Sequence, residues 1–145
     1  MTGKDVSIKL VSRQNDGNSK EESELISTGL YEPTETGYRI SYEESEAKGF
    51  EGSITTLETD GCRKVTMTRT GAVESNLVVE MGTKQHCVYG TPYGDFMVGI
   101  TAKSIRSDLD ENGGLLFFHY VIDVNSSYIG DFEITIEVKA ANVVA

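Results

Sequence analysis

Short runs in which apolar and polar residues alternate with a period of two are the feature that most limits the folds open to this 145-residue chain. Residues 4–13 alternate in this way near the start, and residues 131–139 alternate strictly near the end. Successive side chains of a β-strand point to opposite faces, so each run predicts a strand with one buried and one solvated face. The 15 Gly and only 2 Pro residues suit tight turns between uninterrupted strands.

Runs of this kind recur along the chain and predict about eight to ten antiparallel strands joined by short turns, with no convincing helix. Residues 43–48 form either one helical turn or a charged loop. Residues 114–124 are apolar on both faces and should be the most buried strand. A meander removes its exposed edges best by closing, so we expect a closed antiparallel up-and-down β-barrel. It would be one domain, residues 1–145, with an ordered core of about residues 4–139. A two-sheet sandwich is the alternative, but its long crossover connections have no obvious place here.

The net charge of −10 and the isoelectric point of about 4.6 argue against nucleic acid and against an anionic membrane surface as partners. Two cysteines, Cys62 and Cys87, are too few for a disulfide framework and are expected to be free thiols. The first residues lack an apolar core of signal-peptide length, and no apolar run approaches the ~20 residues of a membrane span. We therefore expect a cytoplasmic protein.

The dipeptide Asp60-Gly61, between two β-rich runs, is the sharpest local signal. A two-residue Asp-Gly loop favours a type I′ turn, which would fix the pairing of the flanking strands. That register places Glu58 opposite Arg63, Thr56 opposite Val65 and Ile54 opposite Met67. The face that carries these residues and Arg69 is predicted to be the interior. The outer face is predicted to carry threonines, namely Thr55, Thr66, Thr68 and Thr70.

Two segments, KVTMTRTGAVESNLVVEMG and TPYGDFMVGITAKSIRSDLDENGGLLFFHYVID, resemble the YwiB-like proteins, a family of small bacterial proteins found mostly in the Gram-positive Firmicutes. The similar region runs from residue 64 to residue 136, and the earlier strands follow the pattern more loosely. The resemblance implies a calycin-like (lipocalin-like) β-barrel and a cytoplasmic bacterial origin. It implies no function, because the family is uncharacterised, and it supplies no catalytic residues.

No motif in the chain specifies a metal, a cofactor or a reaction. Asp108, Asp110, Asn112 and Gly113 match the first half of a calcium loop, but the closing glutamate position holds His119 and the flanks read as strands. The motifs of serine hydrolases, nucleotide-binding loops and zinc proteases are absent. A dyad of Cys62 or Cys87 with His119 stays open but has no support. We expect no metal, no cofactor and no enzymatic activity.

The barrel interior is the remaining candidate site. Arg69 follows Val65 and Met67 at a period of two and should face inward, where its permanent charge needs a carboxylate, backbone carbonyls, water or an anionic ligand. The predicted pair Glu58–Arg63 lies at the opposite end of the same face. An uninterrupted hairpin at Asn112-Gly113 pairs Arg106 with His119 and places His119 inside. A bulge within residues 104–108 would reverse this.

Two functions from different classes follow. The first is a binding module that holds a small, partly apolar ligand in the barrel, with Arg69, His119, Arg106, Glu58 and Arg63 as candidate ligand-binding residues. The second is a structural or interaction protein with a filled interior that works through its surface. An enzyme ranks third.

The facing of residues 114–124 also bears on assembly. If Phe117 and His119 point inward, then Leu116, Phe118, Tyr120 and Ile122 point outward and form a row too apolar for open solvent. We then expect another element or a second copy to cover that row, the latter as a homodimer through the outer face around Phe118 and Tyr120.

Overall fold

A computed structural model of the chain describes residues 4–43, 54–71, 75–91, 94–124 and 126–140. All regular structure in these residues is β-strand, and no helix among them is long and apolar enough to cross a membrane. The expected helical turn or loop at residues 43–48 lies almost wholly outside them. The strands are β1 (Lys4–Asn15), β2 (Lys20–Pro33), β3 (Tyr38–Glu43), β4 (Ile54–Asp60), β5 (Lys64–Thr70), β6 (Ser75–Glu80), β7 (Gln85–Thr91), β8 (Gly94–Asp110), β9 (Gly113–Val124) and β10 (Ser127–Ala140).

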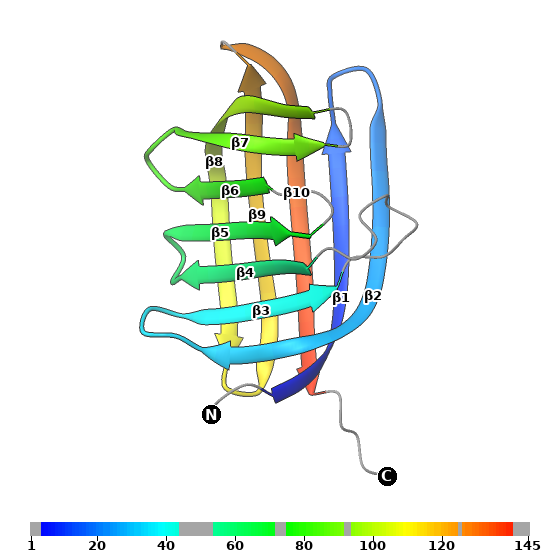
Figure 1. The fold of residues 1–145 in the computed structure, drawn as a ribbon, viewed down its shortest axis with the longest axis vertical. Helices are drawn as coiled ribbons and strands as arrows, with labels where there is room; N and C mark the ends of the chain where they lie inside the picture. Colours follow the sequence, from blue (N-terminus) through cyan, green and yellow to red (C-terminus); the bar gives the residue numbers. More distant parts are fainter. Residues whose placement is uncertain (1–3, 44–53, 72–74, 92–93, 125, 141–145) are drawn as a thin grey trace.

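The strands form one antiparallel sheet that curls almost completely into a barrel, as the alternating runs predicted. Its order is β6-β5-β4-β3-β2-β1-β10-β9-β8-β7, so each strand but one pairs with the next along the chain. The first strand pairs with the last along Val6–Ala140 to Asn15–Asp131. The sheet ends at β6 and β7, which lie side by side (Figure 1). The predicted barrel is therefore confirmed, with its break between two strands that follow one another in sequence.

Two hydrogen bonds that involve side chains cross this break. A single backbone bridge in the described residues, Glu80–Thr83, lies at the turn between β6 and β7. Further along, the amide of Val78 donates a hydrogen bond to the buried Cys87 sulfur at 3.3 Å. The Gln85 amide donates to the Glu80 carboxylate at 2.5 Å. A thiol thus occupies a place that a backbone carbonyl would hold in a regular ladder.

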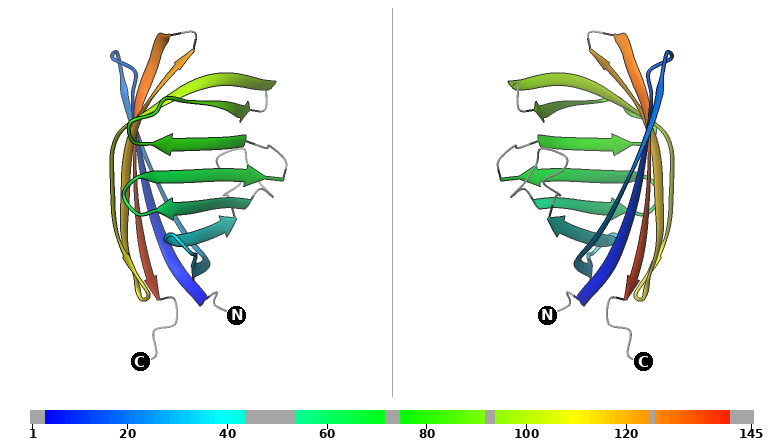
Figure 2. Two further views of the ribbon diagram at one scale, coloured as in Figure 1. Left: turned by 90° about the vertical axis from the view of Figure 1, so that its left-hand side faces the viewer. Right: turned by 90° about the vertical axis from the view of Figure 1, so that its right-hand side faces the viewer.

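The barrel has two walls whose strands cross steeply. Strands β1, β2, β8, β9 and β10 run upright in Figure 1, whereas β3 to β7 run across them. The turned views show the same two walls from the sides (Figure 2). Two long strands belong to both walls: β2 pairs with β1 and then with β3, and β8 pairs with β7 and then with β9. Each bends where it passes from one wall to the other.

Gly29 lies at the bend of β2, where it pairs with Val6 on one side and Tyr42 on the other. A Cβ added there would lie 2.1 Å from the Ser41 carbonyl oxygen and 2.7 Å from Ile8 Cδ1. Both distances are far below van der Waals contact, so a side chain cannot fit without moving backbone. The absence of a side chain at Gly29 therefore allows the two walls to meet at this corner.

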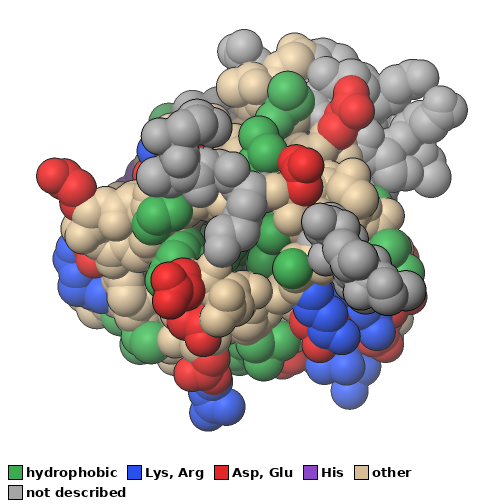
Figure 3. Space-filling view, turned by 90° about the horizontal axis from the view of Figure 1, so that it is seen from below, with side chains coloured by type: hydrophobic (Ala, Val, Ile, Leu, Met, Phe, Trp, Pro, Cys, Tyr) green, Lys and Arg blue, Asp and Glu red, His purple; other side chains and the backbone are tan. Residues whose placement is uncertain are grey.

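The interior is apolar. Among the described residues, twenty-one buried apolar side chains from all the strands form one cluster, which includes Tyr31, Ile40, Leu57, Phe118 and Ile136. The lower end of the barrel shows hydrophobic side chains near its middle, while Lys and Arg side chains lie toward the margin (Figure 3). Burial of this apolar surface is the main contribution to stability, at about 25 cal/mol per Å².

The β4–β5 hairpin differs from the predicted register. Asp60 pairs with Lys64, so three residues rather than two form the loop, and Glu58 lies opposite Thr66 instead of Arg63. The shift is an odd number of residues along β5, which reverses the faces of β4 relative to β5. Leu57 becomes fully buried opposite Met67, and Glu58 becomes exposed. The predicted register would have placed a carboxylate inside and a leucine outside, which explains why it is not adopted.

The β8–β9 hairpin also departs from prediction. Its loop is Glu111-Asn112, between the paired residues Asp110 and Gly113, and a bulge lies between Ala102 and Ser104. Arg106 is therefore opposite Phe117, and Ser104 is opposite His119. The bulge is one residue before the window in which a reversal was anticipated, and it has that effect: Ile100 shares the interior with Ile122, and His119 faces outward.

This reversal corrects the predicted outer apolar row. Phe118 is fully buried and Tyr120 is 5% exposed, and both belong to the core. Tyr120 stacks between Phe118 and Phe132, at ring-centroid distances of 5.9 and 5.4 Å. The outer face around Phe118 and Tyr120, through which a homodimer was expected, therefore does not exist, because the barrel wall itself encloses these side chains.

We predict that Gly29→Ala lowers the free energy of unfolding by about 2–3 kcal/mol, because its Cβ overlaps the Ser41 carbonyl. Urea denaturation measures the change. Gly61→Ala is the matched control: its φ is +56° and nothing lies within 4 Å of its added Cβ, so only the left-handed backbone counts, at about 1 kcal/mol. Equal losses in the two variants would contradict the close approach at the corner.

Candidate functional site

A row of polar side chains crosses the interior face of the wall that β3 to β7 form. Gly29 pairs with Tyr42, Tyr42 with Thr55, and Thr55 with Arg69, across β2, β3, β4 and β5. Directly paired residues share a face and have Cβ atoms about 4.5–5.5 Å apart. Thr55 is fully buried and Tyr42 is 6% exposed, so this face is the interior. We call Tyr42, Thr55 and Arg69 the interior polar row.

Arg69 lies at the accessible end of the row. Its side chain is half-buried, and its Nε atom is enclosed. Each member of the row takes part in a further interaction within the chain. The described side chains on the interior face of β3 to β6 include no other charged group, so Arg69 sets the electrostatic character of that surface. An arginine keeps its charge at any physiological pH and presents five donors in a planar fork.

The next rows on the same face are apolar and tightly held. Ile40, Leu57 and Met67 lie side by side and continue from Tyr31 to Leu77. The Tyr31 ring stacks on Tyr38 at 5.0 Å, and its hydroxyl donates to the Asp110 carbonyl at 2.7 Å. Burial raises the pKa of the Tyr31 hydroxyl, with smaller contributions from Tyr38 and Asp110. Tyr31 therefore stays protonated and ties β2 to the β8–β9 turn.

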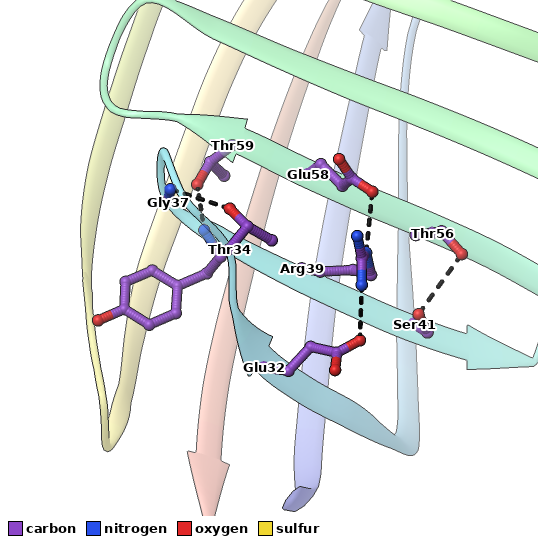
Figure 4. Close-up of polar contacts among 9 residues, drawn as sticks. Glu32, Thr34, Gly37, Arg39, Ser41, Thr56, Glu58 and Thr59 are labelled. Carbon is purple, nitrogen blue, oxygen red and sulfur yellow. Dashed lines mark hydrogen bonds and ion pairs between the residues drawn. The ribbon is translucent and has the colours of Figure 1, made fainter. Parts of the chain in front are cut away.

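Of the five candidate ligand-binding residues, Arg69 alone lies on the interior face of the barrel. Glu58 lies on the outer face, where its carboxylate accepts a hydrogen bond from Arg39 Nε at 2.8 Å. Arg39 also bonds Glu32 at 2.8 Å, so one guanidinium bridges carboxylates from two strands (Figure 4). The Glu58 carboxylate, followed by that of Glu32, raises the pKa of the Arg39 guanidinium. This cluster is an outer clamp across β2, β3 and β4.

Arg63 and Arg106 are also outside. Arg63 lies in the β4–β5 loop and forms ion pairs with Asp60 and with Glu80, the latter at 3.2 Å. Arg106 is exposed on β8, opposite Phe117. The three-residue loop leaves Arg63 outside the β4–β5 ladder, and the bulge between Ala102 and Ser104 turns Arg106 to the outer face of β8.

His119 lies on the outer face of β9, between Ser104 of β8 and Glu133 of β10. Its side chain is 25% exposed, and its Nε2 atom is 3.9 Å from the nearest Asp131 carboxylate oxygen. Cys62 is exposed, in the β4–β5 loop beside Ser107, and Cys87 is buried in the break of the sheet. The three side chains therefore belong to separate places, and within the described ranges no three His, Cys, Asp or Glu side chains gather as metal ligands.

A half-open hollow of about 440 Å³ lies beside the β1–β2 hairpin and the start of β10. Charged side chains dominate its lining, and Arg13 bridges Glu22 at 3.5 Å and Glu133 at 3.9 Å within it. Its lining is Arg13, Gln14, Asn15, Lys20, Glu21, Glu22, Asp131 and Glu133. The hollow offers no apolar side chain to a partly apolar ligand.

Sequence reasoning missed two members of the interior polar row. Tyr42 was visible in the alternation of Tyr38, Ile40 and Tyr42, but its neighbour on the next strand could not be named without the correct register. Thr55 was assigned to the outer face. A useful signal was the sequence ITTLETD, in which an inward Leu57 requires Thr55 and Thr59 to face inward as well.

We predict that a double-mutant cycle on Arg39→Met and Glu58→Gln gives a coupling of about 0.5 kcal/mol, as expected for a largely exposed ion pair. The same cycle on Arg63→Met and Glu58→Gln should give none, since these residues are not paired in the observed register. Urea denaturation of the variants provides both values. If Glu58 couples to Arg63 and not to Arg39, the observed register is contradicted and the two-residue turn is supported.

Comparisons with known proteins agree with this architecture. The family described as a domain of unknown function, DUF1934, matches residues 8–136. The "Uncharacterized beta-barrel protein YwiB" of Bacillus subtilis is 30% identical over 111 residues, which cover 77% of this chain and 75% of that protein. The crystal structure of the ywiB protein superposes with a TM-score of 0.77 and 26% identity, over 93% of this chain and 92% of that one. The chain therefore belongs to the DUF1934 family of uncharacterised β-barrel proteins.

Proposed function

We propose that this protein is a binding module that holds a small, partly apolar ligand against the interior face of its barrel. The observation that carries the proposal is an uneven burial of interior side chains. Leu57, Val65 and Phe118 are fully buried, whereas Leu25, Met67 and Phe132 pack against the same core and stay partly accessible. Part of the apolar interior can therefore be reached from solvent.

The accessible side chains belong to both walls. Leu25 is on β2 opposite the buried Leu10, and Phe132 is on β10 opposite Tyr120. Met67 is on β5 beside Leu57. Small-molecule sites in proteins are concave, mostly apolar and provided with a few polar groups. Partly accessible apolar groups on two facing walls, with a polar row beside one of them, suit such a ligand better than they suit bulk water.

The proposal is for binding without chemistry. The interior polar row offers donors and one fixed positive charge, but no carboxylate or imidazole stands with it as a general base among the described interior residues of β3 to β6. The net charge of −10 also disfavours nucleic acid and anionic membranes as partners.

The second candidate is an interaction protein that works through its outer surface. It is favoured by large apolar side chains that the barrel leaves exposed, among them Ile26 at 70% and Met97 at 60%. Ile26 follows Leu25 on β2 and therefore points to the opposite side of the wall. This pair of neighbours lets one experiment separate the two candidates.

We predict that N-phenyl-1-naphthylamine, a neutral probe that fluoresces in apolar sites, binds the wild-type protein saturably. Leu25→Trp should abolish most of this binding, because the larger ring fills the accessible interior. Ile26→Trp is the matched control and should leave it unchanged. Fluorescence titration gives the affinities, and native mass spectrometry of freshly purified protein reports any ligand retained from the cell and the state of assembly.

The outcomes discriminate between the candidates. If Ile26→Trp abolishes probe binding and Leu25→Trp does not, the probe binds on the outer surface. That result would support the interaction protein. No saturable binding to wild type would remove the ligand-binding proposal. Circular dichroism and urea denaturation of both tryptophan variants establish that each barrel is folded.

A further inference from the structure

We propose that the interior polar row selects ligands that carry a single oxyanion, so that the ligand class is an apolar body with a carboxylate or related anionic head. The inference rests on the proposed interior binding and adds the identity of the polar end. Tyr42, Thr55 and Arg69 are neighbours on β3, β4 and β5 and face the interior together.

The chemistry of the three side chains is complementary to an oxyanion. Arg69 presents N–H groups in a fork that matches the two oxygens of a carboxylate, and the hydroxyls of Tyr42 and Thr55 can donate to the same group. Each of the three also keeps an interaction within the chain. Side chains that already hold an interaction are restrained, so less side-chain ordering is needed when an oxyanion binds.

The position of the row accounts for the apolar body. Met67 is two residues before Arg69 on the same face of β5, and it is one of the accessible apolar side chains. Beyond it lie Leu57 and Ile40 in the adjacent apolar row. A ligand with its anionic head at Arg69 can thus lay an apolar chain along Met67. The polar end and the apolar end of the site are two residues apart along β5.

Gly29 closes the other end of the row without a polar side chain, because the Ser41 carbonyl and Ile8 Cδ1 occupy the place where a side chain would lie. It pairs with Tyr42 but contributes no side chain, and Ser27, the next interior position of β2, is half-buried. The row therefore has a charged end at Arg69 and a small, neutral end at β2. This asymmetry orients a ligand with one charged group, and it provides no second cation for a ligand with charges at both ends.

The charge of the whole molecule makes the preference diagnostic. With a net charge of −10, long-range electrostatics repel anions. A protein of this charge that binds an anion more tightly than its neutral analogue must do so through a local positive group. On the described interior face of β3 to β6 that group is Arg69.

The test compares decanoate with decanol, which share the same chain length and differ in the charge of the head, in displacing N-phenyl-1-naphthylamine at pH 7.5. We expect wild type to bind decanoate more tightly. Arg69→Met, which keeps the apolar stem, should weaken decanoate about tenfold to a hundredfold, since it removes charge-assisted hydrogen bonds. Its affinity for decanol should change less than about threefold, because transfer of the alkyl chain is unaffected.

The matched control is Arg106→Met, which removes the same charge from the exposed outer face of β8 and should leave both affinities unchanged. Thr55→Val removes one hydroxyl from the row at nearly constant volume and should weaken decanoate alone, by about threefold to tenfold. This second variant keeps the inference testable if Arg69→Met does not fold. Acetate, which has the head without the body, should not compete.

Each result decides the matter. Equal affinities of wild type for decanoate and decanol would overturn the head-group inference while interior binding stands. Equal weakening by Arg69→Met and Arg106→Met would show that the anion responds to net charge and not to the interior row. Failure of both ligands and of the neutral probe to bind would overturn the proposed function together with this inference.

Discussion

The ladder between β1 and β10 is the constraint on which the barrel depends. It joins the two ends of the meander along ten residue pairs, from Val6–Ala140 to Asn15–Asp131. With those edges paired, the sheet curls on itself. Side chains from both walls then form a single apolar cluster in the interior. The bends of β2 and β8 then follow, because each long strand must serve both walls, and Gly29 permits the closest of these approaches. The same ladder pairs the edges that β1 and β10 would otherwise expose, which leaves β6 and β7 as the edges of the sheet.

Sequence periodicity predicted the strands well because burial of one face imposes a period of two on each strand separately. The relative facing of neighbouring strands was harder to predict. It depends on whether a hairpin loop has two residues or three, and on whether a bulge interrupts the ladder. Asp60-Gly61 carried the signal of a two-residue loop, but burial of Leu57 outweighed that local preference. The bulge after Ala102 has no comparable signal in the sequence, and it decided the facing of His119.

The residues of the candidate site likewise fall into those that one strand places and those that need the register of several strands. Arg69 could be placed on the interior from residues 65–69 alone, because its facing relative to Val65 needs no partner strand. Thr55 and Tyr42 could not be joined to it, since their proximity is a property of three strands in register. Glu58, Arg63, Arg106 and His119 were wrongly placed in the interior because their facing depends on the hairpin loops and the bulge, and their side chains meet outer partners or solvent. A polar row on the interior face of a barrel can thus be identified only after the register of the paired strands is known.

The location of the break in the sheet has a consequence for chain connectivity. The two strands at the break, β6 and β7, are consecutive in sequence, while the strands at the two ends of the described chain are paired. A circular permutant with its ends joined and its chain opened between β6 and β7 would therefore run through the sheet in strict order, from one edge to the other. Every ladder would then link strands adjacent in the permuted chain, which lowers the contact order and so favours faster folding. The natural connectivity instead makes closure wait for the final strand of the chain.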